Sequence, residues 1–300
     1  MAPRWDENTS GERRAARTSS WRKTAQKSST RTTFFSRSRV SASCGTPRVY
    51  VSGSTISSAS VRIERDIDVL HVERGGNGPL LVLLHGLGAT GEVWRDVVRD
   101  WPGSWLVPDL PGHGRSPRIE RYSFGSLAAE VARVVPREPV TVVGHSLGGV
   151  VGLALASGWF GVDVTTCVGV GIKVRWTDEE LEKAAALAAR PAKVFPTREE
   201  AVERASRTAG VPIEHGVSEV DGGWTTALDV RAFGVGRPDL PGLIMAAKAR
   251  VVLAAGENDP MSPREHLEEL VPAPVVLPGA GHNVHVESPS SLRLLLTERP

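Results

Sequence analysis

The stretch Gly144-His145-Ser146-Leu147-Gly148-Gly149, which follows Pro139-Val140-Thr141-Val142-Val143, decides the fold expected of this chain. The preceding run is short, apolar and β-branched, as is typical of a strand buried on both faces. The apolar run at 150–156 is long enough for a helix. Between them, the Gly-x-Ser-x-Gly pattern predicts a sharp strand-to-helix turn that lifts the Ser146 hydroxyl above the sheet. A side chain at Gly144 or Gly148 would collide with the neighbouring strand and helix.

Elsewhere in the chain, apolar runs that predict strands alternate with runs that predict helices. The expected strands are 80–84, 104–107, 140–143, 164–174, 250–255 and 274–277, preceded by an antiparallel edge at 61–72. The expected helices are 93–101, 126–135, 150–157, 264–270 and 292–296. This alternation predicts an α/β fold with a mostly parallel sheet covered by helices on both faces.

Residues 176–247 interrupt the alternation, because they contain no run that is typical of a strand. Two capping boxes, Thr177-Asp178-Glu179-Glu180 and Thr197-Arg198-Glu199-Glu200, predict that a helix begins at each. We therefore expect a mostly helical insertion that acts as a lid over the ends of the sheet.

The first 60 residues differ in composition from the rest of the chain. They contain 22 Ser or Thr, and 11 Lys or Arg against 3 Asp or Glu, a charge balance of +8. Such a segment buries too little apolar surface to offset its chain entropy, so we expect 1–60 to be a disordered basic tail. Three interpretations of the tail stay open: a true translation start near Val61, which we favour, an organellar transit peptide, or a basic arm that contacts anionic partners.

Composition also narrows the classes of partner. Residues 61–300 carry 25 Lys or Arg against 31 Asp or Glu, a balance of −6, which indicates no nucleic-acid partner. The chain has no apolar run of 18 residues, so no membrane segment is expected. Cys44 lies in the tail and Cys167 in an apolar run, so we expect no disulfide and a reducing, cytoplasmic location. No metal-ligand pattern occurs, no cofactor is expected, and the oligomeric state stays open.

Five segments make residues 61–300 resemble the alpha/beta hydrolase superfamily, in its lidded, esterase-like branch with a serine nucleophile. They are His85-Gly86-Leu87-Gly88 and the segments 108–116, 144–149, 256–260 and 279–282. The resemblance implies a hydrolase core formed by 61–175 and 248–300, with 176–247 as a helical lid. Together the segments are specific for the fold and much less specific for the substrate.

The resemblance implies a catalytic role for three side chains. Ser146 would be the nucleophile, and because a free hydroxyl is a poor nucleophile it needs a base, His282, within hydrogen-bond reach. Asp259 would orient the imidazole and stabilise its charged form, in the chain order Ser, Asp, His expected of this fold. Glu257 and Asp178 are rival acids, but Asp178 lies in the first turn of a predicted helix, which by itself explains an acidic residue.

Two leucines are expected to act through their backbone. Leu87 and Leu147 would supply the two N–H groups of an oxyanion hole, and Leu147 opens a helix whose dipole favours an anion. The other histidines near these segments are interpreted as structural; they are His85, His113, His145 and His285, the last of which competes with His282 as the base.

Large side chains near the lid and the oxyanion loop are candidates for the substrate pocket. They are Trp94, Trp176, Trp224 and Phe233, with Arg175 and Met245 as further members of the lid segment. Packing within the protein is the alternative explanation for each of them.

Together these residues predict a cofactor-free serine hydrolase that cleaves a small or medium carboxylic ester or lactone through an acyl-enzyme. Its partner would be a small-molecule ester or acyl substrate. The serine argues against the haloalkane dehalogenases and epoxide hydrolases of the superfamily, which need a carboxylate nucleophile. The His-Gly-Leu-Gly loop lacks the extra glycine of esterases that accept bulky tertiary-alcohol esters. Three alternatives stay open: a carbon–carbon bond hydrolase of aromatic degradation, a cofactor-free haloperoxidase or perhydrolase, and a non-catalytic, receptor-like binding protein.

Overall fold

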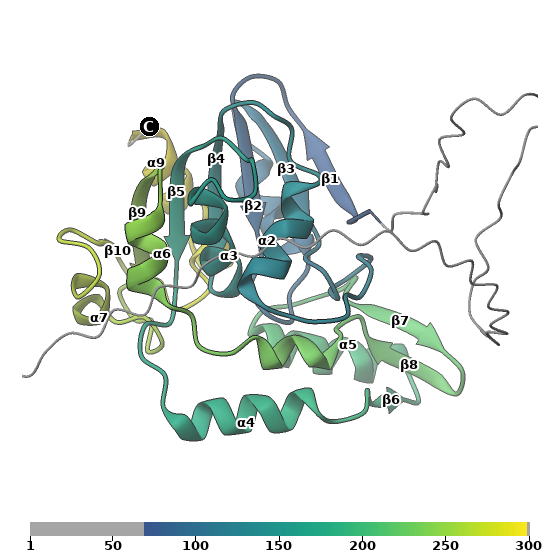
Figure 1. Cartoon of the computed structure of the whole chain (residues 1–300). Coiled ribbons are helices and arrows are strands. Elements are labelled where there is room, and N and C mark those ends of the chain that lie inside the picture. Colours follow the sequence, from purple (N-terminus) through teal and green to yellow (C-terminus); the bar gives the residue numbers. More distant parts are fainter. Residues whose placement is uncertain (1–68, 299–300) are drawn as a thin grey trace, which may run out of the picture. The chain divides into compact units, whose positions relative to one another are not determined.

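The structure, a computed structural model, describes residues 69–298 of the 300-residue chain (Figure 1). The tail at 1–60 and most of the edge predicted at 61–72 lie outside these residues, and β1 (Val72–Gly75) is the first strand described. None of the helices in this part of the chain combines enough length with enough apolar character to cross a bilayer.

Seven strands form one sheet, in the order β1-β3-β2-β4-β5-β9-β10. β1 pairs antiparallel with β3, and every other pair in this sheet is parallel. The α/β fold class expected from the alternating sequence pattern is therefore confirmed. The strands after β1 are β2 (Leu80–Leu84), β3 (Ser104–Pro108), β4 (Val140–His145), β5 (Val164–Val170), β9 (Arg250–Gly256) and β10 (Val275–Leu277).

Helices cover both faces of this sheet. Alternate residues of β2 point to opposite faces, so that Val82 and Leu84 join one hydrophobic cluster while Leu81 and Leu83 join the other. Burying one such leucine side chain contributes about 2 kcal/mol to folding. The helical elements of the core are η1 (Gly91–Trp94), α1 (Arg95–Val98), α2 (Phe124–Ala132), α3 (Leu147–Ala156), α7 (Arg264–Glu268), α8 (Val284–Glu287) and α9 (Pro289–Glu298).

Two glycines allow α3 to lie directly against the sheet. A Cβ atom on Gly144 would lie 2.2 Å from the carbonyl oxygen of Gly148, and one on Gly148 would lie 2.3 Å from that of Leu84. Both distances are far below van der Waals contact, and the atoms concerned are backbone atoms that cannot move aside. All ten residues of α3 are buried.

Residues between β5 and β9 form an insertion, most of which lies beneath the central sheet in Figure 1, while its last helix lies alongside the sheet near β9. The Thr177 hydroxyl accepts a hydrogen bond from Glu180 N, and the Glu180 carboxylate accepts one from Thr177 N, so the first capping box is complete. Thr197 caps the second helix through Glu200 N. The helical elements of the insertion are α4 (Asp178–Ala188), α5 (Arg198–Ala209), η2 (Val230–Val235) and α6 (Leu240–Ala246).

The insertion also contains a small sheet, which was not predicted from the sequence. β6 (Val194–Phe195), β8 (Gly223–Thr226) and β7 (Val217–Val220) pair antiparallel in that order. β7 and β8 are joined by Asp221-Gly222, and Gly222 has a φ of +86°. Asp-Gly is a strong signal for a two-residue hairpin turn. The expectation of no strands was wrong because each of these strands has at most four residues, too few for a clear alternation of apolar and polar positions.

Buried histidines hold the loops at the carboxyl ends of the strands. His85 Nε2 accepts a hydrogen bond from Leu110 N at 2.8 Å, and its Nδ1 donates to Gly86 O at 2.8 Å. His113 Nδ1 donates to Pro111 O at 3.1 Å. Burial lowers the pKa of His85 to about 4 and, together with the neighbouring His85, the pKa of His113 to about 3. Both rings are therefore neutral at physiological pH, as loop-tying residues can be.

Gly148→Ala should lower the free energy of unfolding by about 3 kcal/mol, because its methyl group overlaps the backbone of β2. Chemical denaturation would measure the loss. The matched control is Gly125→Ala in α2, where the nearest atom to the added methyl group would be 3.9 Å away and no loss is expected. Equal stability of Gly148→Ala and the wild type would contradict the close approach of α3.

The buried imidazoles should make the protein sensitive to acid. In the unfolded chain each imidazole binds a proton below about pH 6.5, whereas the folded state keeps His85 and His113 neutral down to about pH 4 and about pH 3. The unfolded state then binds more protons, so the free energy of unfolding falls as the pH drops from about 6.5 to about 4, by up to about 1.4 kcal/mol per pH unit for each ring.

Urea denaturation between pH 8 and pH 4, on the wild type and His113→Gln, would measure this effect. The variant should show a shallower loss of stability, because one of the titrating rings is absent. Identical slopes in the two proteins would show that His113 binds a proton equally in both states.

Candidate active site

Ser146 occupies the turn between β4 and α3. Its φ of 49° and ψ of −113° make it the one non-glycine residue with a positive φ among residues 69–298. Its N–H donates to Val170 O of β5 at 2.8 Å, and its carbonyl accepts from Gly149 N at 3.0 Å. Such strained backbone conformations cluster at functional sites, because the surrounding structure must hold them in place.

Asp259 and His282 come together from loops that follow neighbouring strands. Asp259 lies after β9 and His282 after β10. The buried Oδ2 of Asp259 lies 2.9 Å from His282 Nδ1, and its Oδ1 accepts from Met261 N at 2.9 Å. Since a carboxylate can only accept, Nδ1 donates, and in the neutral ring Nε2 is left able to take a proton.

The rival acids have other partners. Glu257 Oε2 accepts a hydrogen bond from Gly279 N at 2.9 Å, and Asp178 is the first residue of the capped helix α4. Of the three acids considered from the sequence, Asp259 is the one whose carboxylate bonds His282 in the described part of the chain. The structure thus brings together the acid and the base that the resemblance implied.

Ser146 and His282 line one cavity of about 520 Å³. Within residues 69–298 no hydrogen bond joins the Ser146 hydroxyl to the His282 ring. Catalytic hydrogen bonds are often long without substrate and tighten when it binds.

Two backbone N–H groups have no acceptor in the described residues and lie at this cavity. One belongs to Leu87, in the loop after β2, and the other to Leu147, the first residue of α3. The N-terminal end of a ten-residue helix adds a favourable dipole for negative charge. The two groups have the chemistry expected of an oxyanion site.

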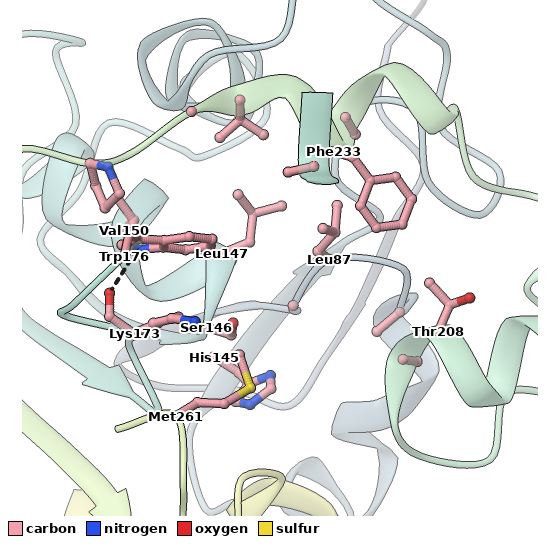
Figure 2. A pocket seen from close by; sticks show the side chains of 18 of the residues that line it. Leu87, His145, Ser146, Leu147, Val150, Lys173, Trp176, Thr208, Phe233 and Met261 are labelled. Atoms are coloured by element: carbon pink, nitrogen blue, oxygen red, sulfur yellow. Dashed lines mark hydrogen bonds between the residues drawn. The ribbon is translucent and has the colours of Figure 1, made fainter. Parts of the chain in front are cut away.

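The walls of the cavity come from the core and from the insertion, and most of them are apolar (Figure 2). Trp176 and Val150 both line the cavity, and Trp176 Nε1 donates to Lys173 O at 3.2 Å. The apolar side chains of the lining include Leu87, Phe124, Leu147 and Val150 of the core and Trp176, Leu181, Phe233 and Val235 of the insertion.

Two of the four pocket candidates line this cavity, and two do not. Trp176 and Phe233 are part of the wall. Trp94 is fully buried, and its ring packs at 4.6 Å from that of His285, so it belongs to the core. Trp224 lies in β8, paired with Phe195 and 6.0 Å from the Arg198 guanidinium. Neither position follows from sequence, because the register of the small sheet and the packing beneath the oxyanion loop are tertiary features.

The other lid candidates also lie away from the cavity wall. Arg175 is exposed and forms an ion pair with Glu269, while Met245 is 85% exposed. Phe124 and Leu181 were not predicted as lining residues. Both lie one helical turn or less from a helix start, at positions where a capped amphipathic helix turns an apolar side chain inward.

The insertion is fastened to the loops that carry the site. The Glu92 carboxylate of η1 accepts hydrogen bonds from Glu214 N at 3.3 Å and His215 N at 3.1 Å. Thr208 of α5 packs so closely on Gly88 that a Cβ on the glycine would lie 2.7 Å from it. Asn283 Nδ2 donates to Gly210 O at 3.4 Å. The insertion is therefore held by these contacts both to the loop that follows β2 and to the loop that carries His282.

His285, the competing base, lies outside the cavity lining. Its ring is buried between Trp94, at 4.6 Å, and His145, at 4.4 Å. Burial and the neighbouring His282 lower its pKa to about 3.

Within residues 69–298, no three His, Cys, Asp or Glu side chains gather as metal ligands do.

Comparison with known proteins places these features in a family. The alpha/beta hydrolase family matches residues 81–292, which is more than half of the chain. The E-2-(acetamidomethylene)succinate hydrolase structure shares the fold, with a TM-score of 0.64 and 24% identity over 76% of this chain and 94% of that one.

Curated relatives match over shorter segments. Ninety residues are 48% identical to a pimeloyl-[acyl-carrier protein] methyl ester esterase of Aeromonas hydrophila and cover 28% of this chain and 35% of that protein. A segment of 108 residues is 38% identical to the magnesium-chelatase 30 kDa subunit of Rhodobacter capsulatus and covers 33% of this chain and 38% of that protein. The chain thus spans little more than a third of the length of these curated relatives. From the breadth of the family match and the fold that accompanies it, the chain belongs to the alpha/beta hydrolase family.

Proposed function

We propose that this protein is a serine hydrolase that cleaves a small or medium carboxylic ester or lactone through an acyl-enzyme. The observation that carries the proposal is the 2.9 Å bond between buried Asp259 and His282, whose ring lines the same cavity as Ser146. A nucleophile, a base and an acid that orients the base are the parts that acyl transfer requires.

In the proposed reaction the Ser146 hydroxyl attacks the ester carbonyl while His282 Nε2 takes its proton. Asp259 stabilises the imidazolium that forms. The N–H groups of Leu87 and Leu147 bind the oxyanion of the tetrahedral intermediate, and one such donor is worth about 3 kcal/mol. His282 then protonates the departing alcohol, and a water molecule activated by the same ring releases the acid from Ser146.

The cavity supports a substrate of modest size. Its volume of about 520 Å³ falls within the range of roughly 300–1,000 Å³ typical of small-molecule sites. Its apolar wall suits an acyl or alkyl chain, because burying each methylene group contributes about 0.8 kcal/mol. A matched relative is named as a methyl ester esterase, which agrees with ester cleavage.

The alternatives predict different behaviour toward simple esters. A carbon–carbon bond hydrolase of aromatic degradation would prefer a diketone substrate to an ester. A cofactor-free haloperoxidase or perhydrolase would need peroxide to show its main activity. A receptor-like protein would bind a ligand in the cavity and would hydrolyse neither esters nor diketones. Parallel assays with p-nitrophenyl esters and lactones, with a diketone, and with an ester in the presence of peroxide separate these classes.

Ser146→Ala should lower kcat for p-nitrophenyl esters by about 10³-fold or more, because the acyl-enzyme can no longer form. A fluorophosphonate probe should attach to Ser146, as located by mass spectrometry. The matched control is Ser218→Ala, an exposed serine of β7 that should leave the rate unchanged. Equal rates for the wild type and Ser146→Ala, or a probe adduct on another residue, would overturn the assignment.

Asp259→Asn should lower kcat by about 10⁴-fold with little change in KM, because the amide favours the wrong imidazole tautomer and cannot stabilise the imidazolium. Steady-state kinetics on the same esters would measure it. Asp178→Asn tests the rival acid and should retain full activity, since that carboxylate lies in the first turn of α4. Full activity of Asp259→Asn together with a large loss of kcat in Asp178→Asn would identify Asp178 as the acid instead.

A further inference from the structure

His145 lies between Gly144 and the nucleophile candidate, and the proposed mechanism gives it no role. It is the last residue of β4 and is 4% exposed. Its Nε2 lies 3.1 Å from the backbone carbonyl oxygen of His282. That carbonyl has no other hydrogen bond in the described part of the chain. One side chain thus connects the strand that carries Ser146 to the loop that carries its base.

The direction of this hydrogen bond follows from simple chemistry. Burial, with His285 and His282 close by, lowers the pKa of His145 well below its usual value, so the ring is neutral. A carbonyl oxygen can only accept, so Nε2 carries the proton and donates it. The unprotonated Nδ1 of His145 lies close to Gly86: a Cβ atom added to Gly86 would be only 2.7 Å from it. The ring is therefore fixed against the oxyanion loop while it holds the His282 loop.

Other groups hold the neighbours of His282 but not its carbonyl. Glu287 accepts hydrogen bonds from Gly281 N and Asn283 N, on either side of His282. Asp259 holds the imidazole at Nδ1. The His145 and His282 rings also contact each other edge to face, with centroids 4.7 Å apart. His282 follows the last strand, β10, and has no ladder partner of its own, so these side chains replace the strand pairing that would otherwise fix it.

We propose that His145 is a positioning residue, whose Nε2–H bond to the His282 carbonyl sets the imidazole at the distance from Ser146 that proton transfer needs. The inference rests on the proposed function, since it assigns the placement of the proposed base. Displacing a reacting group by about 1 Å can cost 10²-fold in rate.

His145→Leu removes the donor and keeps an apolar side chain in its place, and His145→Gln keeps an N–H donor. Kinetics on a p-nitrophenyl ester should show kcat lowered by about 10²-fold in His145→Leu, with a much smaller change in KM, because the bond acts on the base although the His145 ring also lines the cavity. His145→Gln should recover part of that loss. Should His145→Leu fail to fold, the comparison moves to His145→Gln against His145→Asn, whose shorter amide cannot reach the carbonyl.

The decisive readout is the double mutant with His282→Ala. If His145 acts through the imidazole, adding His145→Leu to His282→Ala should leave the residual rate unchanged, whereas the same substitution costs about 10²-fold in the wild type. Equal losses in both backgrounds would show a general structural role and overturn the inference. Thermal unfolding of each variant reports folding independently of rate.

His285→Leu is the matched control, because its ring also packs against His145 yet makes no hydrogen bond to His282. It should lower the unfolding temperature without a selective loss of kcat. Failure of the proposed function is distinguishable, since Ser146→Ala and His282→Ala would then keep wild-type rates. Failure of this inference alone would leave those two variants nearly inactive, with His145→Leu either at full kcat or losing the same factor in both backgrounds.

Discussion

Backbone contact between α3 and the central sheet is the constraint on which the site depends. With glycine at 144 and 148, the first turn of α3 lies against the ends of β2 and β4 with no side chain between them. At that close approach Ser146 has a φ of 49°, and Leu147, whose N–H has no acceptor among the described residues, lines the cavity. Strain of this kind costs on the order of 1–3 kcal/mol, and the burial of every residue of α3 offsets it.

Neutral imidazoles surround the proposed base. His145 and His285 are both buried with lowered pKa values, and neither lies where water could stabilise a charge. A positive charge on either ring would oppose the charging of His282, because like charges repel strongly in an interior of low dielectric. Burial therefore keeps the surroundings of the base uncharged, while Asp259 supplies the one adjacent negative charge among the described residues that bond it.

Much of the fold and part of the site could be predicted from local patterns. The β4–Ser146–α3 turn, the strand alternation and the two helix caps each depend on a few consecutive residues, so their signals survive in the sequence. The hairpin of β7 and β8 was missed although Asp221-Gly222 marks it, because strands of four residues are too short to show a clear period-two alternation. Trp94 and Trp224 were wrongly predicted to line the pocket, because the sequence does not distinguish an aromatic residue that lines a cavity from one that packs within the protein.

By itself the sequence determined the order of the strands along the chain, the strained serine turn and the residue types able to support acyl transfer. Only the tertiary structure decided that Asp259, and not Glu257 or Asp178, bonds His282, and that α4, α5 and η2 complete the cavity wall. The physical reason is the range of the interactions. A turn or a cap is decided by neighbours in the chain, whereas a carboxylate finds its imidazole 23 residues away through the parallel pairing of β9 and β10.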